Sequence, residues 1–408
     1  MMRRLYRYLP PFAGDYSGVG SALYELGGML CIHDASGCTG NYVGFDEPRS
    51  YDSKQLVYCT GLRKNDAILG NEKIYIDKIV QAAKEMKPAF IALVGSPVPM
   101  VIGFDFDGVA REVEHLTGLP TFGFDTSGMK GSYKDGVVMA VLKLLERFGP
   151  SESISSSNNG KVRSVNILGA TPLDISEENL QALRLMLEER GYQINSIFSM
   201  DNRIEDYMNF HRANINLAIT QAGAIIAQHM EKTYGMPYLA GLPIGEAGSV
   251  HYFSCLDQVL EKRKSMEVSQ HPVEVAKECP ASGRKALILE DGIIASSIRV
   301  ELLAQGYSQV DVISLFEKDW AVRNLNISFS QSEEDIVKAV NNGIYSLIVA
   351  DPLILSLYTK KEKRELIAFP KYAISSKLMH QKRWVYLGKS WNDYIKIAEN
   401  SYDIAVNY

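Results

Sequence analysis

The sequence lacks a long apolar run, an excess of basic residues and a cysteine-rich framework. No stretch of 18 uncharged apolar residues occurs, so no transmembrane helix is expected. The formal net charge is −5, which argues against nucleic acid as a partner, because a phosphate backbone attracts basic surfaces. The five cysteines are too few, and odd in number, for a disulfide framework, so reduced thiols or metal ligands are the alternatives.

The composition is that of a soluble globular protein, with 46% hydrophobic and 22% charged residues. The N-terminal segment MMRRLYRYLPPF is basic but lacks the apolar core of a signal peptide. These features predict a cytoplasmic protein. A length of 408 residues is enough for two or three domains.

Apolar, strand-like runs alternate with amphipathic helical patterns. Residues 88–95 (PAFIALVG) predict a buried strand, and residues 101–117 predict a helix. A second strand is expected at 119–125, and a strong amphipathic helix at 134–149. This alternation is typical of a parallel sheet with helices on both faces.

Two polar stretches interrupt the alternation. Residues 150–161 are serine-rich and without periodicity, and residues 271–283 form a second candidate junction. The sequence therefore predicts an α/β fold with three Rossmann-like, doubly wound parallel-sheet domains. The predicted domains are 1–155, which contains most of the cysteines, 156–275 and 276–408.

Three of the five cysteines lie close together in the sequence. Cys31 is expected on a strand, Cys38 in the glycine-rich turn SGCTGN, and Cys59 at the end of a second short strand. Thiolates are the usual protein ligands of iron–sulfur clusters, although the spacing C-x6-C-x20-C is not a standard ferredoxin pattern. The alternative is that Cys31 is a small buried hydrophobe and Cys38 an exposed turn residue. Cys255 and Cys279 are interpreted as structural.

The order of several segments resembles the nitrogenase component 1 family. In that family a glycine-rich helix leads into a strand that ends in a His-Gly-x-x-Gly-Cys turn, and HDASGC at residues 33–38 resembles this turn. The resemblance continues through residues 58–71, 88–132 and 217–245. It implies three α/β domains around a central cleft, a homologous partner subunit, and an iron–sulfur cluster at the subunit boundary.

The resemblance also assigns positions. Cys38 and Cys59 fall on two cluster cysteines of the family, whereas Pro97 occupies the position of a third. Cys31 is an additional thiol that would replace the missing ligand. The segment Ile219–Gln221 stands where the family's cofactor-anchoring cysteine would be. No nitrogenase-type molybdenum cofactor is therefore expected, and dinitrogen is not the expected substrate.

The function implied by the resemblance is that of a reductase subunit. Cys31, Cys38 and Cys59 would bind a [4Fe-4S] or larger cluster, and the fourth ligand would come from the partner or from Asp34. Electrons would come from an ATP-dependent iron protein. The partner would be a homologous subunit or a second copy, in a dimer or tetramer.

Two alternative functions remain. One is a non-catalytic scaffold or cofactor-assembly subunit, and the other is a cluster-free protein whose cleft binds a small molecule. The sequence does not identify the substrate.

Overall fold

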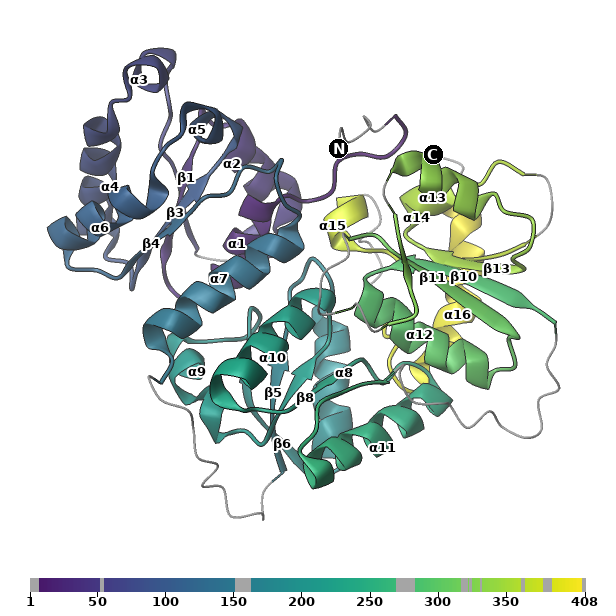
Figure 1. Cartoon of the computed structure of the whole chain (residues 1–408). Helices are drawn as coiled ribbons and strands as arrows, with labels where there is room; N and C mark the ends of the chain where they lie inside the picture. Colours follow the sequence, from purple (N-terminus) through teal and green to yellow (C-terminus); the bar gives the residue numbers. More distant parts are fainter. Residues whose placement is uncertain are drawn as a thin grey trace.

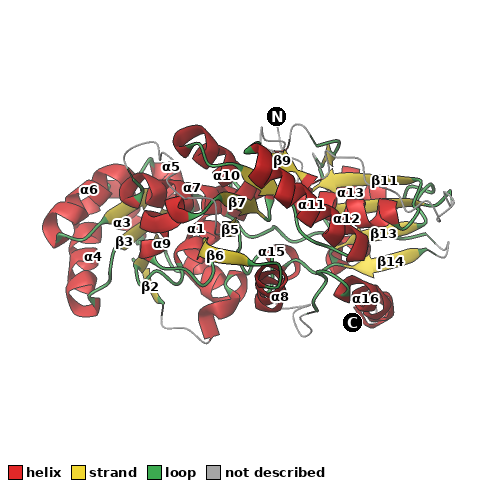
Figure 2. Cartoon of the chain, turned by 90° about the horizontal axis from the view of Figure 1, so that it is seen from below, coloured by secondary structure: helices red, strands yellow, loops and turns green. Residues whose placement is uncertain are grey.

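The chain forms three parallel β-sheets, each covered by helices (Figure 1). The computed structural model describes residues 7–51, 55–150, 163–268, 283–316, 322, 325–330, 332–360, 364–376 and 384–405. Seen from below, the N-terminal unit lies at the left and the C-terminal unit at the right, and the middle unit overlaps the N-terminal unit in this view (Figure 2). The expected three-sheet α/β architecture is confirmed. The predicted boundaries at 155 and 275 lie outside the described residues.

The N-terminal sheet carries the candidate cysteines. Its order is β2 (Leu56–Cys59), β1 (Met29–His33), β3 (Ile91–Gly95) and β4 (Thr121–Phe124). The helices of this unit are α1 (Asp15–Leu23), α2 (Gly37–Asn41), α3 (Lys64–Leu69), α4 (Glu72–Met86), α5 (Pro97–Ile102), α6 (Phe106–Thr117) and α7 (Tyr133–Phe148). All residues of β1 and β3 are buried, as expected for central strands of a parallel sheet.

The middle and C-terminal sheets repeat the same winding. The middle sheet has the order β6 (Tyr192–Ile197), β5 (Arg163–Leu168), β7 (Ile215–Ala218), β8 (Tyr238–Ala240) and β9 (Met266–Glu267). The C-terminal sheet has the order β12 (Ser328–Phe329), β11 (Gln309–Ser314), β10 (Lys285–Glu290), β13 (Leu347–Ala350) and β14 (Glu365–Ala368). In each sheet the chain first adds a strand on one side of the starting strand and then reverses to the other side, which defines a doubly wound fold.

The helices of these two units cover both faces of their sheets. The middle unit contains α8 (Glu177–Glu188), α9 (Ile204–Asn209), α10 (Gln221–Tyr234) and α11 (Glu246–Lys262). The C-terminal unit contains α12 (Gly292–Ala304), α13 (Glu333–Val340), α14 (Pro352–Leu355), α15 (Tyr372–Ser375) and α16 (Ser390–Ala405). Among the described helices, none has both the length and the apolar character that a membrane span requires.

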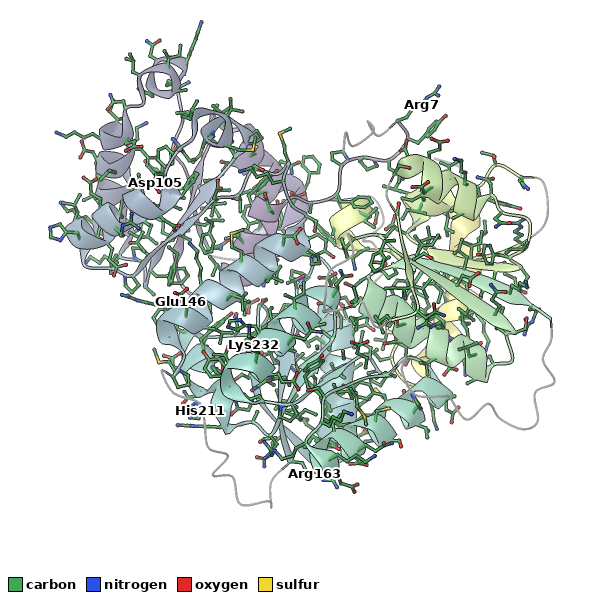
Figure 3. All side chains as sticks on the ribbon, viewed as in Figure 1. Arg7, Asp105, Glu146, Arg163, His211 and Lys232 are labelled. Carbon is green, nitrogen blue, oxygen red and sulfur yellow. The ribbon has the colours of Figure 1, made fainter. Side chains whose placement is uncertain are left out.

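The helix predicted over residues 101–117 is in fact two helices. α5 ends at Gly103, whose φ of +69° is a left-handed conformation that glycine adopts without strain. Asp105 then begins α6 by accepting a hydrogen bond from the amide of Gly108 at 2.9 Å (Figure 3). The glycine stop and the aspartate cap explain why one amphipathic pattern is divided.

The N-terminal segment extends to the C-terminal unit. The backbone amides of Arg7, Tyr8 and Leu9 donate to the carboxylate of Glu333 at 2.6–2.8 Å. Arg7 accordingly lies next to α13 in Figure 3. Leu9 is buried in the core of the C-terminal sheet. The two ends of the described chain are thus held by one unit.

Helices α1 and α7 cross with their backbones in close contact. A Cβ atom added at Gly136 would lie 1.8 Å from the carbonyl oxygen of Asp15, and one added at Gly18 would lie 1.8 Å from that of Tyr133. Backbone atoms cannot move aside as a flexible side chain can. The crossing therefore requires glycine on both helices.

We expect Gly136→Ala to lower the free energy of unfolding by about 1–3 kcal/mol, because the methyl group forces the two helices apart. Replacing glycine by alanine in a helix interior normally stabilises a protein by about 1 kcal/mol. A loss of stability in Gly136→Ala would therefore show that the α1–α7 backbone contact outweighs this gain. Urea denaturation measures the effect. Gly40→Ala is the matched control, since a Cβ at Gly40 in α2 has no neighbour within 4 Å. Equal stability changes in the two variants would contradict the prediction.

Candidate metal centre

Cys38 and Cys59 lie on the same side of the N-terminal sheet. β1 and β2 are parallel neighbours, and Cys59 is paired with Ile32. Ile32 belongs to the hydrophobic core on the α1 and α7 side of the sheet, against which Cys38 also packs. Paired residues of neighbouring strands point to the same face. Both thiols are half-buried rather than enclosed.

Asp34 connects the two cysteines. Its backbone carbonyl accepts a hydrogen bond from the Cys59 thiol, with a sulfur–oxygen distance of 3.6 Å. Its carboxylate oxygen Oδ2 accepts from the amides of Ser36 at 3.0 Å and Thr39 at 3.1 Å. These bonds reverse the chain after β1 and start α2, which carries Cys38. The segment SGCTGN, predicted as a turn, contains the short helix α2 (Gly37–Asn41).

Cys31 lies on the opposite face of the sheet. It is fully buried, with 0% exposure, in a core formed with residues of α4 and α6. Burial raises the pKa of the Cys31 thiol well above its ordinary value, which favours the neutral form. The structure brings Cys38 and Cys59 to one face and does not bring Cys31 to them, because side chains alternate along a strand.

Polar groups surround Cys38. Asp46 accepts hydrogen bonds from the Ser17 hydroxyl at 2.6 Å and from the Asn41 amide at 2.8 Å. Burial raises the pKa of Asp46 to about 6. Burial and the Asp34 carboxylate raise the pKa of the Cys38 thiol, whereas a hydrogen bond with Tyr16 lowers that pKa. No sequence pattern points to Tyr16 or Asp46, since their proximity to Cys38 depends on the packing of α1.

The donor set is incomplete in one chain. Within the described ranges, no three side chains of the types His, Cys, Asp or Glu lie close enough together to hold a metal ion. An iron–sulfur cluster usually takes four cysteine ligands. Cys38 and Cys59, both free and half-buried, would supply two ligands of such a set.

The other cysteines are elsewhere. Cys255 is buried in α11, and its sulfur lies 3.7 Å from Nε2 of His251. Cys279 lies outside the described residues. Cys255 has no other thiol near it in the described middle unit, which agrees with its interpretation as structural.

A second polar cluster lies where loops of the middle and C-terminal units meet. The ammonium of Lys371, which follows β14, donates to Asp174 at 2.7 Å and to Glu290 at 2.5 Å. Tyr133, the first residue of α7, donates its hydroxyl proton to Asp174. The side chains of Asp174, Glu290 and Lys371 are only 1–2% exposed. This Lys371 cluster joins residues from all three units.

Two further carboxyl groups border the cluster. Asp291 accepts from the amide of Gln221 at 2.8 Å, and Asp351 accepts from the amide of Lys371 at 2.9 Å. Burial, the largest effect, raises the pKa of each to about 7. Asp291 follows β10 and Asp351 follows β13, so the loops after these two strands meet at the Lys371 cluster.

The comparisons with known proteins agree on one family. The family model of nitrogenase component 1 type oxidoreductases matches residues 15–288. The nitrogenase iron-molybdenum cofactor biosynthesis protein NifE of Nostoc sp. (strain PCC 7120 / SAG 25.82 / UTEX 2576) is 26% identical over 350 residues, 82% of this chain and 68% of that protein. The nitrogenase molybdenum-iron protein alpha chain of Methanosarcina barkeri is 25% identical over 246 residues, 58% of this chain and 45% of that protein.

The solved structure of nitrogenase Cp1 at pH 6.5 has a TM-score of 0.66 and 16% sequence identity, and the alignment covers 100% of this chain and 92% of that chain. At this identity the likeness shows the fold. The NifE protein of Clostridium pasteurianum is 26% identical over 214 residues, and there the chain spans only 44% of the relative's length.

Proposed function

Because the chain belongs to the nitrogenase component 1 type oxidoreductase family, we propose that it is a subunit of an iron–sulfur-dependent reductase that receives electrons from an ATP-dependent iron protein. The observation that carries the proposal is the pair Cys38 and Cys59, which lie half-buried on one face of the N-terminal sheet. Ile219–Gln221 at the position of the cofactor-anchoring cysteine argues against dinitrogen as the substrate.

The ligand set of the proposed cluster is shared between two chains. Two thiols from this chain and two from a second copy or a homologous subunit complete the four ligands that a [4Fe-4S] cluster usually takes. Asp34 is a further candidate ligand, because a carboxylate can replace a thiolate. The exposed apolar side chains of Val43 (36% exposed), Phe45 (56%) and Tyr51 (67%) follow Cys38 in the chain and suit a subunit contact.

The chain's own residues prepare the thiols for this role. A bound iron–sulfur cluster would supply one-electron transfer. Cys38 and Cys59 must lose their protons to bind iron, and the raised pKa of the Cys38 thiol keeps it protonated until metal arrives. The Tyr16 hydroxyl beside Cys38 offers a hydrogen bond to its sulfur, which is one way a protein adjusts a cluster's potential.

We expect Cys38→Ala and Cys59→Ala to lose their iron almost completely, from about four atoms per dimer to background, because each cluster iron needs a protein ligand. Anaerobic purification with iron analysis and charge-transfer absorbance measures this. Cys255→Ala, a buried cysteine far from the pair, is the control. Full iron content in both site variants would contradict the proposal. Cys31→Ala should keep its iron, since Cys31 lies on the other face of the sheet.

A second candidate function is a scaffold subunit for cofactor assembly. The named NifE relatives favour it, as does the Lys371 cluster, which fills the meeting point of the loops. The two functions differ in electron flow. If the reductase proposal is right, a purified ATP-dependent iron protein should reduce the cluster in an ATP-dependent way, measured by electron paramagnetic resonance. Reduction without ATP dependence, or none, would favour the scaffold.

A further inference from the structure

A cavity of about 260 Å³ opens in the N-terminal unit, on the α4 side of β1 and β2. Its walls come from the ends of β1 and β2, from α3, from the first turns of α4, and from the loop at 102–104 after α5. It lies on the opposite face of the sheet from Cys38 and Cys59. The cavity is therefore distinct from the candidate metal centre.

The position of the cavity is the one that ligands prefer in this fold. The sheet order β2-β1-β3-β4 reverses direction between β1 and β3, and the cavity lies beyond the carboxyl ends of β1 and β2. Ligands of doubly wound sheets bind at such switch points. The N-terminus of α4, a helix of 15 residues, also opens onto the cavity at Asn71 and Glu72. The amides of Asn71 and Glu72 already donate to the carbonyls of Asp66 and Gly70, so this helix end contributes only its dipole to the cavity.

Aromatic rings, including that of His33, form the floor of the cavity. The His33 ring lies 4.2 Å from the ring of Tyr75 and 4.6 Å from that of Phe104, measured between ring centres. Its Nδ1 is hydrogen-bonded to the hydroxyl of Thr60 at 2.8 Å. His33 is only 4% exposed and lines the cavity, and no described residue partners its Nε2. Nε2 of His33 is therefore available to a ligand or a water molecule in the cavity.

Two opposite charges line the cavity without pairing with each other. The Lys78 ammonium donates to the carbonyl of Thr60 at 2.9 Å, which leaves two of its three protons free. The Asp66 carboxylate accepts no hydrogen bond from the described residues, and no salt bridge joins the two. Both groups lie close enough to His33 to affect its charge. Glu72, in the first turn of α4, also lines the cavity, so the cavity presents one cation, Lys78, and two carboxylates, Asp66 and Glu72, above an apolar floor.

We propose that this cavity binds an apolar α-amino acid in its zwitterionic form. The ligand's carboxylate is held by Lys78, and its ammonium group by Asp66, with Glu72 as a second carboxylate on the same wall. The apolar side chain packs on Tyr75 and Phe104. The cavity volume of about 260 Å³ is large enough for an amino acid of the size of leucine. The inference goes beyond the proposed reductase function and does not depend on the cluster.

Isothermal titration calorimetry of the full chain with L-leucine and L-phenylalanine tests the proposal. We expect saturable binding that Lys78→Met and Asp66→Asn each weaken by about tenfold or more, because each variant removes a charge-assisted hydrogen bond. 3-Phenylpropanoate, which lacks the ammonium group, and phenethylamine, which lacks the carboxylate, should both bind more weakly than phenylalanine. Lys84→Met, an exposed position on α4, is the matched control.

A second variant keeps the proposal testable if the charge variants fold poorly. Ala67→Leu adds side-chain volume at a residue that lines the cavity and leaves all charges in place. It should abolish binding while circular dichroism remains unchanged. No saturable binding of either amino acid would overturn the proposal. So would binding that Lys78→Met and Asp66→Asn leave unaltered, or equal affinity for phenylalanine and its two truncated analogues.

Discussion

Lys371→Met should lower the free energy of unfolding by about 3–5 kcal/mol, because it leaves two buried carboxylates without their cation. Lys371 is 1% exposed and lies 2.7 Å from Asp174 and 2.5 Å from Glu290. One oxygen of Glu290 already has no hydrogen-bond partner within the described residues. Removing the ammonium adds uncompensated negative charge at a place that water does not reach.

Urea denaturation followed by circular dichroism measures this effect. Lys389→Met is the control, since the Lys389 side chain is 85% exposed and its contact with Glu246 is long, at 3.9 Å; it should change stability by less than about 0.5 kcal/mol. Adding Glu290→Gln to Lys371→Met should restore part of the loss by removing one unpaired charge. A Lys371→Met variant as stable as the parent would contradict the view that this ion cluster holds the three units together.

The sequence predicted the three sheets well because their central strands, such as β3 and β7, are buried on both faces. Runs such as residues 88–95 are continuously apolar, which distinguishes central parallel strands from the half-exposed strands of antiparallel sheets. The helix break at Gly103 was missed because an amphipathic pattern continues across it. Only the combination of a left-handed glycine and the Asp105 cap ends one helix and starts the next.

The candidate site was predicted less completely. Cys38 and Cys59 came together because β1 and β2 are neighbours. Side chains alternate between the two faces along the strand MLCIH, so the sequence predicts that Cys31 and Ile32 face opposite ways. The sequence alone does not say which face carries the candidate metal centre. Lys371 lies in FPKYAIS, and no local pattern marks it. Its partners Asp174 and Glu290 are distant in the chain, and only the tertiary packing joins them.

The same cluster predicts how stability depends on pH. Burial raises the folded-state pKa of Asp291 and of Asp351 from an ordinary 3.8 to about 7. Both carboxyls are therefore protonated in the folded protein at pH values where the unfolded chain has ionised them. Their contribution to stability is fully present at acidic pH and is lost as the pH rises through about 7. Each group lowers the free energy of unfolding by about 1.4 kcal/mol per pH unit in this window.

We therefore expect the chain to lose about 2 kcal/mol per group between pH 5 and pH 7, with little further change above pH 8. Asp291→Asn and Asp351→Asn each remove one titrating group, so each variant should be less pH-dependent than the parent by that amount. The absolute stability of both variants falls too, since each carboxyl group accepts a hydrogen bond from a backbone amide. The diagnostic quantity is therefore the difference in the slope of the free energy of unfolding against pH.

Asp46, with a pKa of about 6, adds a slope of the same sign in the parent and in the variants, so its effect cancels in the comparison. Asp125→Asn, at a side chain that is 68% exposed, is the control and should leave the slope unchanged. Parallel curves of the free energy of unfolding against pH for the parent and both cluster variants would contradict the prediction. They would mean that Asp291 and Asp351 are ionised in the folded state. Lys371 would then neutralise more of the cluster than its two salt bridges imply.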